Sequence, residues 1–237
     1  MKGVLIDVSG NWAHFRKPET SNNPLSHDFI TKTALIGLMG AVLGKERADM
    51  RLLFPQLSDD LLYGVQVKNA VKKQSWGFTN RSISDAFAKV PKQMELIREP
   101  SYFVMIGLVN GRSEALFEQF AARIQAQETH FTPVLGLHNC PAELSLINSG
   151  SLDFVPDGSF KTKGFITTTL HKPHVAGASS FRVGFDRVPS FQNDDFWNLP
   201  DRYFSVVYPS ETVTQQHSLS AIGPHYNFTD QSQWVLI

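Results

Sequence analysis

The first residues that could bind an anion lie in the segment AHFRKPET, residues 13–20. It places His14, Arg16 and Lys17 in a polar loop that follows the first apolar run. Arginine presents a planar fork of donors that suits phosphate, and lysine adds a point charge. Beside a helix N-terminus such a loop can form an anion site, because the first N–H groups of a helix lack intrahelical partners. The alternative is a solvated loop with a few charges.

A second segment, residues 31–44, carries Gly37, Gly40 and Gly44 at spacings of three and four. At least two of these glycines share a helix face. Glycine inside a helix costs about 1 kcal/mol relative to alanine, so its presence needs a reason. Close approach of RNA or of a partner backbone is one reason, and tight packing against a sheet is the other. No lysine–serine or lysine–threonine pair ends the segment, which excludes a GxxxxGK phosphate loop.

A third segment, residues 66–81, interleaves cations with aromatic residues and contains no acid. Trp76 and Phe78 lie among its cations, which are Lys68, Lys72, Lys73 and Arg81. Cations for phosphates and rings for bases are what binding of single-stranded RNA requires. The alternative is an exposed hairpin whose tryptophan covers the core.

A fourth segment, residues 135–143, brings His138, Cys140 and Glu143 together. The set suggests a thiol nucleophile or a metal, but neighbours in sequence usually point apart, which favours a buried structural cysteine. His171 and His174 also lie close together, but Pro173 between them indicates a loop and no third ligand is evident. The sequence therefore predicts no metal and no cofactor.

Composition narrows the class of protein. The 237 residues hold 22 Lys plus Arg and 22 Asp plus Glu, so any RNA site must concentrate positive charge locally. The single cysteine excludes a disulfide framework within this chain. The N-terminus lacks the pattern of a signal peptide, and no apolar stretch reaches the roughly 18 residues of a membrane span. We expect a cytoplasmic protein.

Hydrophobic patterns predict the elements that would position these segments. Six elements are expected, in the order strand, helix, strand, strand, helix and strand, at residues 3–8, 31–44, 61–67, 94–109 (interrupted at Pro100), 110–127 and 131–144. This α+β order is ferredoxin-like and close to an RNA-recognition domain. After residue 150, short β-like runs predict a β-rich C-terminal lobe, with runs at 164–170, 179–188 and 202–208. We therefore expect a domain at 1–148 and a lobe at 149–237.

Three motifs in order resemble the Cas-five family, the RAMP-type subunit of type I CRISPR Cascade complexes. They are GNWAHFRKPET, PLSHDFITKTALIGLMGAVLG and FTPVLGLHNCPAEL, which together with the N-terminal strand span residues 1–145. The resemblance implies a ferredoxin-like RAMP domain with an inserted β-hairpin thumb, placed at about residues 61–93. It does not extend in detail to the C-terminal lobe.

The resemblance also implies partners and RNA-binding residues. Members of the family hold the 5′ handle of the guide RNA (crRNA) and dock the Cas-seven backbone subunit and the large Cas-eight subunit, which reads the protospacer-adjacent motif in target DNA. The matching motifs carry over Arg16, Lys17, Lys32, Thr33, Gly37, His138 and Asn139. Order and composition alone place Lys68, Lys72, Lys73 and Trp76 on the thumb.

Two other functions compete with this non-catalytic, RNA-capping role in antiviral defence. One is a metal-independent endoribonuclease that processes precursor crRNA, which needs a base, an acid and a cation in one site. His14, Tyr63, Lys68 and His138 are the candidates for those roles. The other is a standalone RNA-recognition-like module or a metabolic α/β protein, against which the lack of common catalytic motifs argues.

Overall fold

The computed structural model of the chain describes residues 1–81, 89–173, 182–191, 200, 202–210 and 218–237. Helices are few and strands are many, so the expected mixed α and β composition with a β-rich C-terminal half is confirmed. The helices are α1 (Lys32–Leu43), α2 (Arg47–Asp60), η1 (Gly111–Ser113) and α3 (Glu114–Gln125). The strands are β1 (Lys2–Ser9), β2 (Trp12–Ala13), β3 (Leu61–Val67), β4 (Lys72–Arg81), β5 (Lys89–Arg98), β6 (Ser101–Leu108), β7 (Glu143–Val155), β8 (Ser159–Thr162), β9 (Ile166–Thr167), β10 (Lys172–Pro173), β11 (Val183–Phe191), β12 (Arg202–Pro209), β13 (Leu219–Ile222), β14 (His225–Phe228) and β15 (Gln233–Trp234).

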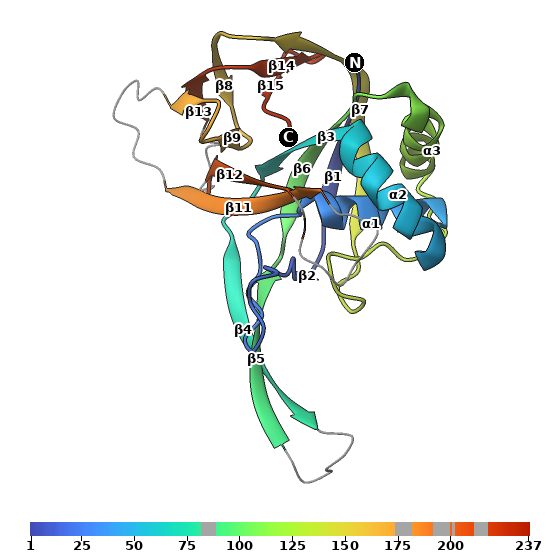
Figure 1. Cartoon of the computed structure of the whole chain (residues 1–237), viewed down its shortest axis with the longest axis vertical. Helices are drawn as coiled ribbons and strands as arrows, with labels where there is room; N and C mark the ends of the chain where they lie inside the picture. Colours follow the sequence, from blue (N-terminus) through green and yellow to red (C-terminus); the bar gives the residue numbers. More distant parts are fainter. Residues whose placement is uncertain (82–88, 174–181, 192–199, 201, 211–217) are drawn as a thin grey trace.

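A six-stranded sheet in the order β15-β14-β7-β1-β6-β3 forms the centre of the molecule (Figure 1). β1 alternates between two cores, as the period of a strand requires. Val4, Ile6 and Val8 belong to the large core that α1 and α3 complete. Leu5 faces the other way, into a smaller cluster with Met105, Leu152, Phe228 and Trp234. Helices therefore cover one face of the sheet, and on the other face side chains from its own strands, β14 and β15 included, form the smaller cluster.

The helix expected at 31–44 is present as α1, with the predicted ends. The Thr31 side chain accepts a hydrogen bond from the Ala34 N–H at 3.3 Å and caps its start. Gly44, at φ 71°, ends it in the left-handed conformation that favours glycine. The next helix, α2, was not expected, because it buries few apolar residues and contains Pro55. Its packing on α1 stabilises it where its own pattern does not.

The strand expected at 131–144 is wrong. These residues form a compact loop, in which Val134 bridges Pro141 and the Leu135 N–H donates to the Cys140 carbonyl at 2.7 Å. The fourth strand of the expected order is instead β7, which pairs with β1 on one side and with β14 on the other. β7 runs through residue 148, where the domain boundary was expected, and pairs with β14 beyond it. The C-terminal residues thus extend the central sheet as well as forming two small sheets of their own.

A long antiparallel hairpin, β4–β5, projects from the body between β3 and β6 (Figure 1). Residues 61–67, with which the thumb was expected to begin, form β3 at the edge of the central sheet. Pro100 lies between β5 and β6, as the sequence indicated. Within the described part of the chain, no helix is long and apolar enough to span a membrane.

Candidate nucleic-acid interface

A pocket of about 610 Å³ lies at the base of the hairpin and along the first half of α1. Three segments that the sequence singled out separately line it: the loop at residues 14–16, the start of α1 at Thr31–Gly37, and the loop at residues 134–137. Met94 of β5 and Phe54 of α2 complete its walls. Most of the lining is apolar, and Arg16 supplies its one charged guanidinium group.

The pocket depends on close contact between two loops. The His14 N–H donates to the Leu135 carbonyl at 3.0 Å. Gly136 follows at φ 89°, and a Cβ there would lie 1.9 Å from the His14 carbonyl oxygen. Only glycine combines that conformation with that approach. The sequence did not single out Gly136, although its place in the LGLHNC motif was the available signal.

Buried His14 is a structural part of the pocket wall. Its side chain is 4% exposed, and Nδ1 lies 2.6 Å from the Glu95 carbonyl oxygen. Burial lowers the pKa of His14 below its ordinary value, although the Glu95 carbonyl opposes that shift. The ring is therefore neutral at pH 7, with Nδ1–H donating to β5. It joins the loop to the hairpin base.

The glycines at positions 37, 40 and 44 have different surroundings, and packing explains only one of them. At Gly40 a Cβ would lie 2.5 Å from the Met50 sulfur, so this glycine lets α2 pack on α1. Gly44 is the helix cap. At Gly37 the nearest atom to a Cβ would be Phe54 Cζ at 3.7 Å, an ordinary contact, and the position faces the pocket. Packing within the chain therefore does not require Gly37.

A neighbouring hollow of about 420 Å³ continues the pocket along α1. It shares Gly37, Ala41 and Phe54 with the first pocket and ends at Lys45 and Arg47. The two hollows form one trough over the small-residue face of α1. A backbone can approach the helix closely there, with cations near both ends.

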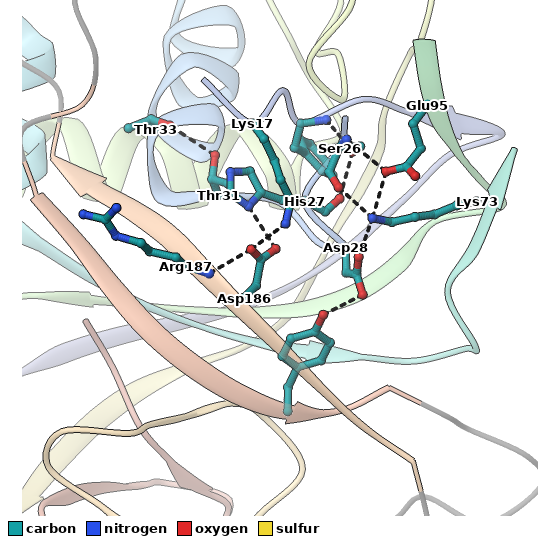
Figure 2. Close-up of polar contacts among 12 residues, drawn as sticks. Lys17, Ser26, His27, Asp28, Thr31, Thr33, Lys73, Glu95, Asp186 and Arg187 are labelled. Atoms are coloured by element: carbon teal, nitrogen blue, oxygen red, sulfur yellow. Dashed lines mark hydrogen bonds and ion pairs between the residues drawn. The ribbon is translucent and has the colours of Figure 1, made fainter. Parts of the chain in front are cut away.

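A network of ion pairs holds the loop of residues 14–28 against the C-terminal half (Figure 2). Lys17 Nζ lies 2.8 Å from Asp186 Oδ1, and His27 Nδ1 lies 2.9 Å from Asp186 Oδ2. The Asp186 and His27 side chains are 4% and 1% exposed. Burial alone would raise the pKa of Asp186, but hydrogen bonds and charge from His27 and Lys17 hold it well below its ordinary value. Lys17, expected on RNA, is therefore directed into the protein, whereas adjacent Arg16 is exposed.

The second part of the network anchors the hairpin. Lys73 Nζ lies 2.7 Å from Asp28 Oδ1 and 2.9 Å from Glu95 Oε1, between the two carboxylates (Figure 2). Asp28 in turn accepts a hydrogen bond from the Tyr208 hydroxyl of β12. Burial lowers the pKa of Lys73, but the two carboxylates outweigh it and raise the pKa above its ordinary value. These acidic partners could not be predicted from the sequence, because they lie 45 and 22 residues from Lys73 along the chain.

The hairpin presents aromatic residues on one face. Trp76 is opposite Met94 and Phe78 is opposite Lys92, and residues directly opposite in an antiparallel pair share a face. The Trp76 and Phe78 side chains are 47% and 44% exposed. The Trp76 ring meets Trp12 edge-on at 5.6 Å. Because Met94 also lines the pocket, this face leads from the pocket outward along the hairpin.

The remaining predicted RNA-binding residues divide between surface and interior. Lys32 is buried and donates to the Ser58 carbonyl at 2.8 Å, and burial lowers its pKa to about 8. Lys68 pairs with Asp7, and Lys72 lies 3.6 Å from Glu99. Thr33 lines the pocket. His138 and Asn139 are exposed in the loop that follows Leu137.

The structure does not gather the four candidate catalytic side chains. His14 lies in the pocket wall, Tyr63 is fully buried in the core, Lys68 is bound to Asp7, and His138 is exposed. Among the described residues, no three His, Cys, Asp or Glu side chains lie together as a metal site. His171 bonds to Thr167 and to the Pro224 carbonyl, while His174 lies outside the described residues. Cys140 is buried, and burial raises the pKa of its thiol.

Comparisons with known proteins define the class of the chain. The chain belongs to the Cas_Cas5d family, described as CRISPR-associated protein (Cas_Cas5), whose model matches residues 3–208. This membership supports a role in CRISPR defence. No curated protein matches the chain in sequence.

Solved structures share its fold. A CRISPR protein from Archaeoglobus fulgidus has a TM-score of 0.61 at 13% identity, and the match covers 99% of this chain and 98% of that one. A chain of a CRISPR RNA-guided surveillance complex has a TM-score of 0.50 at 14% identity, covering 90% of this chain and 92% of that one. At such low identities the likeness shows the fold alone.

Proposed function

We propose that this chain is a non-catalytic, RNA-binding subunit of a type I CRISPR Cascade ribonucleoprotein and that it holds the 5′ handle of the guide RNA. The observation that carries the proposal is the pocket itself, which gathers three separate segments beside a hairpin with exposed aromatic residues. Family membership and the shared fold of a chain from an RNA-guided surveillance complex support it.

The core is ferredoxin-like under this proposal, and β4–β5 is the thumb. The support is the strand order β7-β1-β6-β3, with α1 and α2 between β1 and β3 and α3 between β6 and β7. The hairpin is inserted between the second and third of these four strands. The Cas-seven and Cas-eight subunits would dock on other surfaces of this chain.

Each part of the trough has a chemical role in holding RNA. Exposed Arg16 offers a bidentate donor to a phosphate. The small-residue face of α1 at Gly37 admits the ribose-phosphate backbone, while apolar walls accept a base. Trp76 and Phe78 provide rings on which further bases stack, each worth about 1–3 kcal/mol. Lys17 and Lys73, which are held in ion pairs, and buried Lys32 would act indirectly, by fixing the elements that form the trough.

The dispersed positions of the four candidate catalytic residues support a binding role over RNA cleavage. A general base must lie within hydrogen-bonding reach of the 2′-hydroxyl, together with an acid and a cation. His14 Nδ1 is already bonded to β5, and burial raises the pKa of Tyr63 far above its ordinary value. The purified chain should therefore leave repeat RNA uncut in the absence of metal.

The test is binding of the guide RNA that co-purifies with the tagged chain from a host carrying its neighbouring genes and a CRISPR array. The 5′ fragment is identified by sequencing and synthesised as the probe. Arg16→Ala should weaken binding about tenfold and reduce the slope of log affinity against log salt by about one. Lys172→Ala is the matched control, because Lys172 is exposed on β10 and does not line the pocket.

Two substitutions at Gly37 distinguish a blocked pocket from an unfolded chain. Gly37→Leu should lower RNA affinity more than tenfold, because its side chain enters the pocket, while Gly37→Ala should retain binding. Alanine should also stabilise the helix by up to about 1 kcal/mol. Equal RNA affinity in the parent and Gly37→Leu, or co-purification of the chain without RNA and without other proteins, would refute the proposed function.

A further inference from the structure

The outer edge of β7 is an open strand edge. β7 pairs with β1 along Glu143–Ser151, but β14 covers its other edge only along Leu152–Val155. Among the residues that the structure describes, no strand pairs with the outer edge of residues 143–151. The opposite edge of the sheet differs, because the N–H and carbonyl of Tyr63 on β3 exchange hydrogen bonds with Ile237. An unpaired row of N–H and C=O groups is a template for another strand.

The hydrogen bonds at the end of β7 show which backbone groups point outward. The N–H and carbonyl of Leu152 both bond to Met1. Because these groups alternate in direction along a strand, the N–H and carbonyl groups of residues 151 and 149 point away from β1. At Ser151 the Thr229 hydroxyl covers these groups, at 2.9 Å from the N–H and 3.2 Å from the carbonyl. In the described part of the chain, the Ser149 N–H donates only to the side chain of Asn148, at 2.9 Å. The covered part of the edge therefore ends between Ser151 and Ser149.

The sequence of this edge lacks two of the usual devices that prevent pairing. Native edge strands commonly carry lysine or proline to prevent association. Residues 143–151 contain neither, and Glu143 is their only charged residue. Ile147 is 49% exposed beside the edge. A groove of about 320 Å³ runs between this strand and the end of α3, which lies beside β7 (Figure 1).

The chemistry of the groove favours a polypeptide over nucleic acid. It is lined by uncharged groups, with the amides of Gln125, Gln127 and Asn148 and the hydroxyls of Ser145 and Ser149. Among the described residues no cation lines the groove to neutralise a phosphate, and Glu143 at the end of the strand would repel one. Backbone donors and acceptors in an extended row are satisfied best by another extended backbone.

We propose that the edge of β7 at residues 143–149 binds an extended segment of a neighbouring protein subunit, which adds a strand to the central sheet. A bulge at Ile147 interrupts the register between β1 and β7, because Leu5 pairs with Asn148 and Ile6 with Leu146. The bulge limits continuous pairing to short segments and disfavours a long symmetric pairing of two copies. The partner strand is therefore short and belongs to a subunit held by further contacts. This inference rests on the proposed function, since it requires a multi-subunit complex.

The experiment compares amide hydrogen exchange of the free chain with that of the purified complex. Exchange at residues 143–149 should slow at least about tenfold on assembly, as expected when weak local bonds are replaced by ladder bonds. Ser149→Pro removes an outward N–H and leaves the ladder with β1 intact. It should reduce the fraction of chain incorporated into the complex about tenfold. Ser149→Ala is the matched control, because it removes the same hydroxyl and keeps the outward N–H, and it should assemble like the parent.

Several outcomes would overturn the inference. Equal exchange rates in the free chain and the complex, or equal assembly of Ser149→Pro and Ser149→Ala at matched thermal stability, would show that no strand is added. Protection by the 5′ RNA fragment alone would assign the edge to RNA, and protection in a free-chain dimer would assign it to a second copy. The RNA affinity of Ser149→Pro, measured alongside its assembly, distinguishes failure of this inference from failure of the proposed function. Retained RNA binding with lost assembly supports both proposals, whereas lost RNA binding in Arg16→Ala bears on the pocket alone.

Discussion

Asp186 on β11 should be the residue on which the loop beneath the pocket depends most. It receives hydrogen bonds from Lys17 and His27, which lie 169 and 159 residues away in sequence, and from the Arg187 N–H at 2.8 Å. Asp186→Asn keeps the shape of the side chain and removes its charge. The variant should unfold more readily at neutral pH and should free the loop that carries Arg16.

The magnitude follows from burial. Breaking a buried ion pair by removing one charge costs about 3–5 kcal/mol. Lys17 is 23% exposed and can regain water, and the asparagine oxygen still accepts one bond, so the cost lies at or just below the lower end of that range. We expect a loss of about 2–3 kcal/mol in the free energy of unfolding, because Lys17 loses its charged partner and the hydrogen bond to buried His27 is weakened.

The effect should depend on pH with a defined sign. The pKa of Asp186 is lower in the folded protein than its ordinary value of 3.8, so the folded state binds fewer protons in this range. Its contribution to stability is present above about pH 4 and is lost as the pH falls through the folded value. The difference between the parent and Asp186→Asn should therefore shrink as the pH is lowered below 4.

Urea unfolding followed by circular dichroism, at pH 7 and at steps down to pH 3, measures this difference. Asp157→Asn is the matched control, since Asp157 is exposed in the turn between β7 and β8, and it should change stability by less than about 0.5 kcal/mol. A loss below 1 kcal/mol for Asp186→Asn at pH 7, or a difference that grows as the pH falls, would refute the reasoning.

Two further predictions concern Lys32 and Gly136. Between pH 8 and 10.5 the unfolded chain retains the Lys32 proton that the folded chain has lost. The free energy of unfolding of the parent should therefore rise with pH relative to that of Lys32→Met, by up to about 1.4 kcal/mol per pH unit. Parallel urea titrations of both proteins at pH 7–10 measure it, and identical pH slopes would contradict a lowered pKa. Gly136→Ala should destabilise the protein by about 2 kcal/mol or more, because of its φ of 89° and the 1.9 Å approach to the His14 carbonyl. A melting temperature equal to that of the parent would show that the two loops separate without cost.

The sequence by itself determined the elements that have strong local signals. The β1, β3 and α3 segments have clear periodicity, and Thr31 and Gly44 mark the ends of α1 through their own conformational preferences. It also identified the segments that line the pocket, because glycine, arginine and aromatic residues in loops are unusual enough to be noticed. It could not predict α2, whose pattern is weak, nor the loop at 131–142, whose apolar residues pack as turns rather than as a strand.

Only the tertiary structure decided what each candidate residue does. Arg16 and Lys17 are adjacent and chemically similar, yet one is exposed at the pocket and the other is bound to Asp186. Gly37, Gly40 and Gly44 share one helix, yet they serve the pocket, packing on α2 and the helix cap. The physical reason is the same in both cases. The side-chain type is set by the sequence, whereas the neighbours of each residue are set by folding: Asp186 reaches Lys17 from 169 residues away, and Met50 reaches Gly40 because α2 folds back on α1.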